Sequence, residues 1–117
     1  MTHALRAKRY RKLADYIANK RAKDFSQQRW FCGSAACIAG HCSLMLGWKL
    51  DPHEHTGRMW LHKGKQAGYP DMILGRYLGL NERVMLDLTK SSAPWQFRDA
   101  AVAELRRRAK LEDAKAA

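Results

Sequence analysis

Residues 32–42, CGSAACIAGHC, contain all three cysteines of the chain and one of its five histidines. Thiolates and imidazoles are the usual ligands of structural zinc, so a metal site is the first chemistry to consider. Cys37 and His41 are four positions apart, which on a helix places them on one face with Cys32 as a third ligand in the preceding loop. A fourth ligand would have to come from a distant histidine: His53, His55 or His62.

The spacing of these residues disfavours zinc. Structural sites usually present their ligands in close pairs and need four of them, whereas only one histidine stands beside these cysteines. Cys42 directly follows His41, so on a helix it points about 100° away and cannot easily join the same face. We therefore expect no metal.

Thiol chemistry is the second alternative. The first turn of a helix stabilises a thiolate, which would suit Cys37, and a reversible Cys32–Cys37 bridge stays open. The usual C-x-x-C redox spacing is absent, and a Cys37–His41 nucleophile pair lacks an oxyanion donor and an orienting carboxylate. Residues 51–55, DPHEH, could form an acid–base cluster but are more often a solvated turn. We expect no enzyme and no cofactor.

Packing explains more of this segment. Ala36, Ala39, Gly40 and Ser43 give the predicted helix sides with almost no bulk. A glycine within a helix costs about 1 kcal/mol relative to alanine, so Gly40 is reasonable where a neighbour approaches closely. Cys37 then acts as a small buried hydrophobic residue. We interpret the segment as a helix whose small side chains let neighbouring elements pack closely against it.

Size and composition indicate one folded domain over residues 1–117. Apolar residues make up 46% of the chain and include four tryptophans, which excludes a disordered protein. No apolar run reaches the roughly 20 residues that a membrane span needs, and the N-terminus lacks a secretory signal. Three cysteines cannot form a closed disulfide framework. We expect a cytoplasmic protein with free thiols and no membrane partner.

The net charge is strongly positive, with 22 Lys and Arg against 11 Asp and Glu. Nine of the basic residues fall within residues 1–30, and a second cluster occupies residues 106–108. Such clusters are typical of proteins that bind phosphate backbones, acidic proteins or anionic lipid, although a merely solvated surface also carries them. The candidate nucleic-acid-binding residues are Arg6, Lys8, Arg9, Arg11, Lys12, Lys20, Arg21, Lys23, Arg106, Arg107 and Arg108.

Periodicity predicts a mainly α fold, a compact bundle of about five helices with an irregular or short-strand segment near residues 48–69. The expected helices cover residues 4–22, 34–46, 71–78, 82–90 and 94–113, with a fraying tail. Ser34, Asn81 and Ser92 are expected to cap helix starts, and Gly79 to end a helix in the left-handed conformation. In the last helix, Phe97, Ala101, Leu105 and Ala109 are expected to point inward, and Phe25, Trp30 and Phe31 to plug the core from a connector.

Several of these features stand together in a recognisable order. A helix ending in Phe25 and Trp30 is followed by C-G-[ST]-x-x-C-x-A-G, here residues 32–40, and by a distant Leu-Gly-Leu, residues 78–80. This arrangement resembles a group of small uncharacterised proteins of bacteria and their phages, over about residues 13–110. The resemblance implies a bacterial or phage origin and a shared fold, but no activity.

The first functional hypothesis is a non-enzymatic basic protein that contacts nucleic acid or a nucleoprotein through its terminal helices. The alternative is a phage-encoded inhibitor or adaptor that docks on an acidic surface of a host protein, in an anti-defence or host-takeover role. A structural zinc or thiol-redox protein is a lesser alternative. Residues 74–90 read as helix, glycine turn and helix, but the second helix exposes Glu82 and Asp87, which suits a DNA groove poorly.

Overall fold

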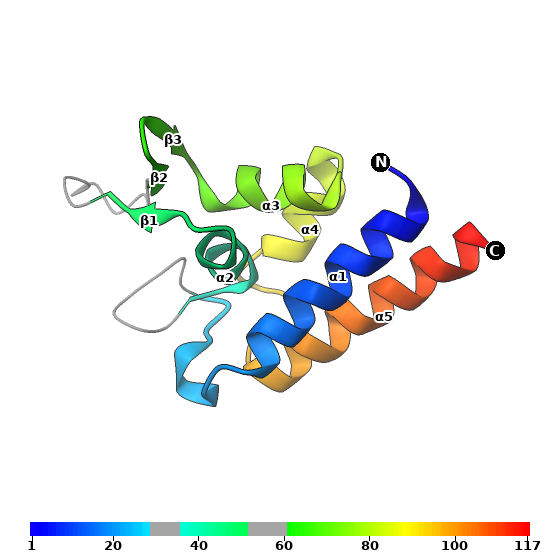
Figure 1. The fold of residues 1–117 in the computed structure, drawn as a ribbon. Coiled ribbons are helices and arrows are strands. Elements are labelled where there is room, and N and C mark those ends of the chain that lie inside the picture. Colours follow the sequence, from blue (N-terminus) through cyan, green and yellow to red (C-terminus); the bar gives the residue numbers. More distant parts are fainter. Residues whose placement is uncertain (29–35, 52–60) are drawn as a thin grey trace.

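The structure, a computed structural model, describes residues 1–28, 36–51 and 61–117. Within these residues it is mainly α-helical, with one small antiparallel sheet (Figure 1). The helices are α1 (His3–Ala18), the 3-10 turn η1 (Ala22–Asp24), α2 (Ile38–Met45), α3 (Pro70–Leu78), α4 (Glu82–Thr89) and α5 (Arg98–Ala116). The strands are β1 (Lys49–Leu50), β2 (Leu61–Lys63) and β3 (Gln66–Gly68), in the order β1-β2-β3. The predicted mainly α fold of five helices with short strands near residues 48–69 is confirmed.

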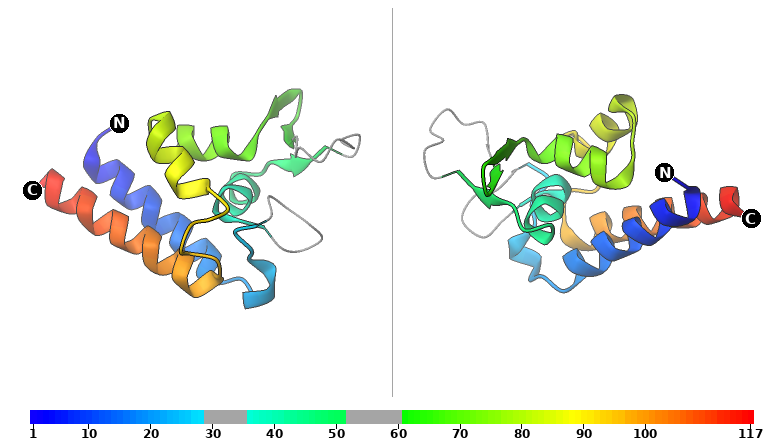
Figure 2. Two further views of the ribbon diagram at one scale, coloured as in Figure 1. Left: turned by 180° about the vertical axis from the view of Figure 1, so that it is seen from behind. Right: turned by 45° about the horizontal axis from the view of Figure 1, so that its top comes forward.

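Helices α1 and α5 lie side by side in opposite directions, although they are the first and last helices of the chain (Figure 1). Helix α2 packs against α1 and α3, and the α3–α4 pair covers the remaining side of the core (Figure 2). The sheet extends from the end of this assembly, away from the α1–α5 pair (Figure 2). The core lies where α1, α2, α3 and α5 meet.

The apolar stripe of α1 is the one expected from its period. Tyr10, Leu13, Ala14 and Ile17 are all buried. The helix ends at Ala18 and not near residue 22, because the chain turns into η1. The carbonyl oxygen of Lys20 lies outside the helix and accepts a hydrogen bond of 2.7 Å from the Arg98 guanidinium of α5.

Helix α2 starts later than expected. Residues 29–35, which include Ser34, Trp30 and Phe31, lie outside the described part, but Ala36 is not helical. Its N–H donates to the carbonyl of Asp24 and its carbonyl accepts from Ser26, both at 3.0 Å, which forms a parallel bridge beside Phe25. Because the N–H and carbonyl of Ala36 bind the connector, Ala36 does not join the helix, and Cys37 is the N-cap of α2. Phe25 is buried in the core as expected.

The α3–α4 corner agrees closely with prediction. Gly79 ends α3 in the left-handed region, at φ 61° and ψ 41°, which a residue without a Cβ adopts at little cost. The Leu80 N–H donates to the Gly75 carbonyl at 2.9 Å, and the Asn81 side chain accepts from the Val84 N–H at 2.9 Å. The corner is held by backbone geometry and by one cap.

The start of α5 was predicted wrongly. The helix begins at Arg98, and Phe97 is its N-cap and is 76% exposed instead of pointing inward. The expected cap Ser92 and the residue Pro94 lie in a loop before the helix. Ala101, Leu105 and Ala109 are buried as expected, and the helix continues to Ala116, past the expected end at residue 113.

No helix in the described residues combines the length with the apolar character that a membrane crossing requires.

Candidate functional site

His41 lies in the core and not at an open site. It is 2% exposed, its ring stacks on Phe25 at 5.8 Å between centroids, and the edge of Tyr16 approaches at 6.1 Å. Its Nε2 lies 2.8 Å from the carbonyl oxygen of Asp24, so this nitrogen carries the proton and donates. Burial lowers the pKa of His41, although the hydrogen bond to Asp24 opposes the shift. His41 is a neutral group that fastens α2 to η1.

Cys37 and Cys42 are buried free thiols. Cys37 caps α2 by accepting a hydrogen bond from the Gly40 N–H, with Sγ 3.4 Å from the nitrogen. Burial raises the pKa of Cys37 to about 11, against the lowering effect of backbone hydrogen bonds such as that from Gly40, and raises the pKa of Cys42 to about 12. The helix start therefore does not produce a reactive thiolate, and the expectation that Cys37 behaves as a small buried hydrophobic residue is confirmed.

A metal site through these residues finds little support in the described part of the chain. Residues 1–28, 36–51 and 61–117 contain no group of three His, Cys, Asp or Glu side chains placed to hold an ion. Cys32, His53 and His55 lie outside these ranges. Cys37 is the N-cap of α2 and not part of its first turn, so it does not share a helical face with His41 as the zinc hypothesis required.

The predicted cationic residues fall into three groups. One group lies on what we term the outer face, the exposed side of the α1–α5 pair: Lys8, Arg11 and Lys12 of α1 and Arg106 of α5, together with Lys110 of α5, which was not among the predicted residues. A second group, Arg6, Arg9, Arg107 and Arg108, lies where these helices approach α3 and α4. A third group, Lys20, Arg21 and Lys23, lies beyond the end of α1. The structure therefore does not gather all of them into one patch.

The cations of the outer face are either unpaired among the described residues or held by exposed ion pairs. The side chains of Lys8, Lys12 and Lys110 make no ion pair or hydrogen bond with any described residue, and all three are exposed. Arg11 pairs with Asp113, and Arg106 pairs with Asp15 at 3.3 Å, which ties the two helices together across this face.

Both ion pairs are themselves exposed. The Arg106 and Asp15 side chains are 54% and 68% exposed, and exposed pairs of this kind contribute only about 0–1 kcal/mol. These arginines can therefore exchange a carboxylate for another anion at little cost.

Other predicted cations serve the fold. The Arg6 guanidinium donates to the carbonyls of Leu78 and Gly79, at 2.8 and 3.2 Å, and pairs with Glu112 at 3.1 Å. Arg9 donates to the carbonyl of Tyr77 at 2.7 Å and lies 5.0 Å from the centre of its ring. These arginines satisfy the carbonyls at the end of α3, so they are not free for a ligand.

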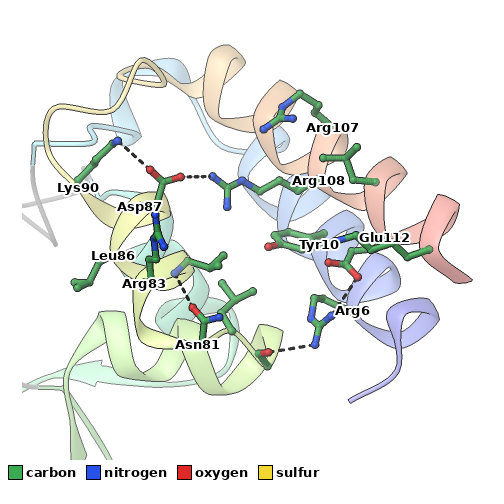
Figure 3. A pocket seen from close by; sticks show the side chains of 15 residues that line it. Arg6, Tyr10, Asn81, Arg83, Leu86, Asp87, Lys90, Arg107, Arg108 and Glu112 are labelled. Carbon is green, nitrogen blue, oxygen red and sulfur yellow. Dashed lines mark hydrogen bonds and ion pairs between the residues drawn. The ribbon is translucent and has the colours of Figure 1, made fainter.

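A cleft of about 920 Å³ lies between α4 and the α1–α5 pair (Figure 3). The α3–α4 corner closes one end, and Tyr10 and Arg6 come from α1 (Figure 3). Six cations and two carboxylates line this cleft together with apolar side chains. The cations are Arg6, Arg83, Lys90, Arg107, Arg108 and Lys115, the carboxylates are Asp87 and Glu112, and the apolar residues include Leu80, Val84, Leu86 and Leu111.

One arginine network builds the wall of the cleft. Arg108, whose side chain is 11% exposed, bridges Glu104 at 3.3 Å and Asp87 at 3.0 Å, and it lies 5.4 Å from the centre of the Trp95 ring. Figure 3 shows the ion pair between Arg108 and Asp87. Asp87 also binds Lys90 at 2.9 Å, and the hydrogen bonds from Lys90 and Arg108 lower the pKa of Asp87. The network fastens α4 to α5 and keeps Asp87 ionised.

The buried carboxylates of α5 are held in the charged form as well. Burial alone raises the pKa of Glu104, but the hydrogen bond from Arg107 and the charges of Arg107 and Arg108 outweigh it and lower the pKa. Glu112 behaves alike: burial raises its pKa, and hydrogen bonds from His3 and Arg6 outweigh that effect. The carboxylates thus neutralise the innermost arginines of the cleft.

Sequence reasoning omitted some of the exposed residues. Arg83 and Lys115 line the cleft, and their side chains have no partner among the described residues. Leu86 and Leu111 line it too, and they are 48% and 49% exposed. The two leucines could have been recognised from the sequence, because each lies outside the buried stripe of its helix. Lys110, on the outer face, could have been added from the period of α5.

The chain matches no protein-family model, no curated protein and no solved structure.

Proposed function

We propose that this chain is a small non-enzymatic binding protein that contacts nucleic acid, or the nucleic acid of a nucleoprotein, through the outer face of the α1–α5 pair. The observation that carries the proposal is the set of lysines on this face, Lys8, Lys12 and Lys110, whose side chains have no partner among the described residues. Flanking them are Arg11 and Arg106, which are held only by exposed ion pairs.

The arrangement suits a phosphate backbone. Lys8 and Lys12 are one helical turn apart, about 6 Å along the axis of α1. Lys110 lies on α5 near the level of Lys12, because it stands between Arg106 and Asp113, which pair with residues 15 and 11 of α1. Helices in contact lie about 8–10 Å apart, so the face presents two parallel rows of positive charge.

The outer face presents charged side chains but no surface for stacking bases. It carries no exposed aromatic side chain from α1 or α5 on which a base could stack, and its long side chains end in ammonium or guanidinium groups. Phosphate contacts position a protein on a duplex without reading sequence. We therefore infer weak, salt-sensitive binding with little sequence preference.

A salt titration of duplex DNA binding tests the proposal. The logarithm of the affinity falls with the logarithm of the salt concentration, with a slope of about −0.9 for each phosphate neutralised. The double variant Lys8→Gln/Lys12→Gln is expected to reduce this slope by about 1–2 and to weaken binding at low salt. Fluorescence anisotropy with a labelled duplex gives both quantities.

A matched control separates position from net charge. Lys49→Gln/Lys65→Gln removes the same charge from exposed positions in β1 and in the β2–β3 turn. It is expected to leave the slope nearly unchanged. If the wild type binds neither DNA nor RNA at low salt, or if both double variants weaken binding equally, the outer face is not the site.

A further inference from the structure

The cleft between α4 and α5 has exposed apolar side chains on both walls. Leu86 of α4 is 48% exposed and Leu111 of α5 is 49% exposed, and both line the same hollow. A single exposed leucine on a surface is ordinary. Two that line one cleft, together with the partly buried Leu80 and Val84, give its lining apolar surface that a partner could cover.

Two cations without partners among the described residues also line the cleft. Arg83 on α4 and Lys115 on α5 are exposed, and neither side chain makes an ion pair or hydrogen bond with the described residues. Arg107 is 60% exposed, although it binds Glu104. The deeper Arg6 and Arg108 are already neutralised by carboxylates. The lining of the cleft therefore combines exposed apolar side chains with exposed cations.

We propose that this cleft binds an acidic amphipathic segment of another protein. The apolar side chains of the segment would cover Leu86 and Leu111, and its Asp or Glu residues would pair with Arg83 and Lys115. This inference goes beyond the proposed nucleic-acid contact and is independent of it, because it uses another face of the molecule.

The size of the cleft fits such a segment. Its volume of about 920 Å³ is near the upper end of the range of ligand pockets, and its α4 wall of eight residues is about 12 Å long. This length corresponds to about two turns of a bound helix. Amphipathic helices bind grooves of this kind through apolar residues three or four positions apart, with charges beside them.

A nucleic acid fits the cleft less well. Single strands bind mainly by stacking bases on aromatic side chains, but Tyr10, the one aromatic residue that lines the cleft, is 2% exposed. Asp87 and Glu112 also lie in the lining, and the pKa of each is lowered by its basic partners. Two fixed negative charges oppose a phosphate chain, whereas a peptide can place uncharged residues beside them.

The test is a selection of random 16-residue displayed peptides on the purified full chain, with excess duplex DNA present to occupy the outer face. The expected result is enrichment of peptides that combine Asp or Glu with Leu, Ile or Phe at helical spacing. The strongest of them is then synthesised with a fluorescent label, and its affinity is measured by anisotropy. A scrambled peptide of the same composition is expected to bind at least tenfold more weakly.

Two variants locate the peptide-binding site on the protein. Arg83→Glu and Leu111→Ser change exposed side chains without described partners, so both proteins should fold, which circular dichroism confirms. Each is expected to weaken peptide binding at least tenfold. The matched controls Lys12→Glu and Leu5→Ser, on α1 away from the cleft, should leave it unchanged.

The outcomes are distinct. Failure to enrich acidic amphipathic peptides, or peptide binding that survives both cleft variants, would overturn the inference. Loss of DNA binding in Arg83→Glu but not in Lys8→Gln/Lys12→Gln would also overturn it, because the cleft would then be a nucleic-acid site. A chain that binds the peptide but no DNA would refute the proposed function and leave this inference standing.

Discussion

His41 is expected to make the stability of the protein depend on pH between 7.5 and 5.5. The folded chain lowers the pKa of His41 through burial, whereas in the unfolded chain it has its ordinary value of 6.5. Below pH 6.5 the unfolded chain binds a proton that the folded chain excludes. The stabilisation due to neutral His41 is therefore complete above pH 6.5 and is lost as the pH falls toward the folded pKa.

The size of the effect follows from proton linkage. One group that titrates only in the unfolded state changes the free energy of unfolding by at most about 1.4 kcal/mol per pH unit. The loss between pH 6.5 and 5.5 stays below this limit, because His41 of the unfolded chain is already half protonated at pH 6.5, while burial of the imidazole and the charge of Lys20 disfavour its protonated form in the folded chain. The carboxylates Glu104 and Glu112 titrate at lower pH and leave this window clear.

Urea unfolding followed by circular dichroism, at pH 7.5, 6.5 and 5.5, measures this slope. His41→Phe keeps an aromatic ring against Phe25 but removes the titrating group. It is expected to cost about 0.5–1.5 kcal/mol at pH 7.5, through the hydrogen bond lost to the Asp24 carbonyl, and to flatten the slope. His62→Gln, in β2, removes a histidine outside the core and should retain the slope. Equal slopes in the wild type and His41→Phe would refute the reasoning.

Three further predictions concern the core, the α3–α4 corner and the thiols. Leu105→Ala leaves a cavity between α5 and α1 and should lower the free energy of unfolding by about 2–5 kcal/mol in urea titrations. Gly79→Ala forces a side chain into the left-handed region with Met1 only 3.2 Å from its Cβ, so a loss of about 1–2 kcal/mol is expected by the same assay. Cys37 and Cys42 should resist iodoacetamide at pH 8 and react only on unfolding, as peptide mass mapping would detect; rapid labelling of either in the native protein would contradict their burial.

Local signals were sufficient where a structure depends on neighbouring residues. Gly79 and Asn81 terminate one helix and start the next through their own backbone and side chain, and both were recognised from the sequence. The buried stripe of α1 was recognised for the same reason, because its period reflects the single face that contacts the core. The mainly α fold follows from elements of this kind.

The remaining elements depend on partners distant in the chain. Ser92 resembles a helix cap, but the loop around it is held by Gln27, whose amide donates to the carbonyls of Leu88 and Lys90 at 3.0 and 3.1 Å. Trp95 donates to the same Leu88 carbonyl at 3.0 Å, so α5 cannot begin until Arg98. The contacts of Gln27 join residues more than sixty positions apart, and no local pattern indicates them.

The cleft could not be predicted for a related reason. Its two walls, α4 and α5, are separate amphipathic helices in the sequence, and Leu86 and Leu111 come to line one hollow only when both helices pack on the common core and Arg108 bridges to Asp87. The sequence shows the charge clusters directly, but it does not show which of their side chains form contacts within the fold. Arg6, which binds Glu112 and the carbonyls at the end of α3, has the same sequence signature as Lys8, which has no partner among the described residues.

The pairing of α1 with α5 has a consequence for how the protein is made. Tyr10, Leu13 and Ile17 of α1 are synthesised before residues 98–116, which form part of the surface that covers them. Until α5 has been synthesised, the growing polypeptide exposes an apolar and positively charged helix surface to which chaperones or ribosomal RNA can bind. The core around α1 is therefore completed only after residues 98–116 have left the ribosome.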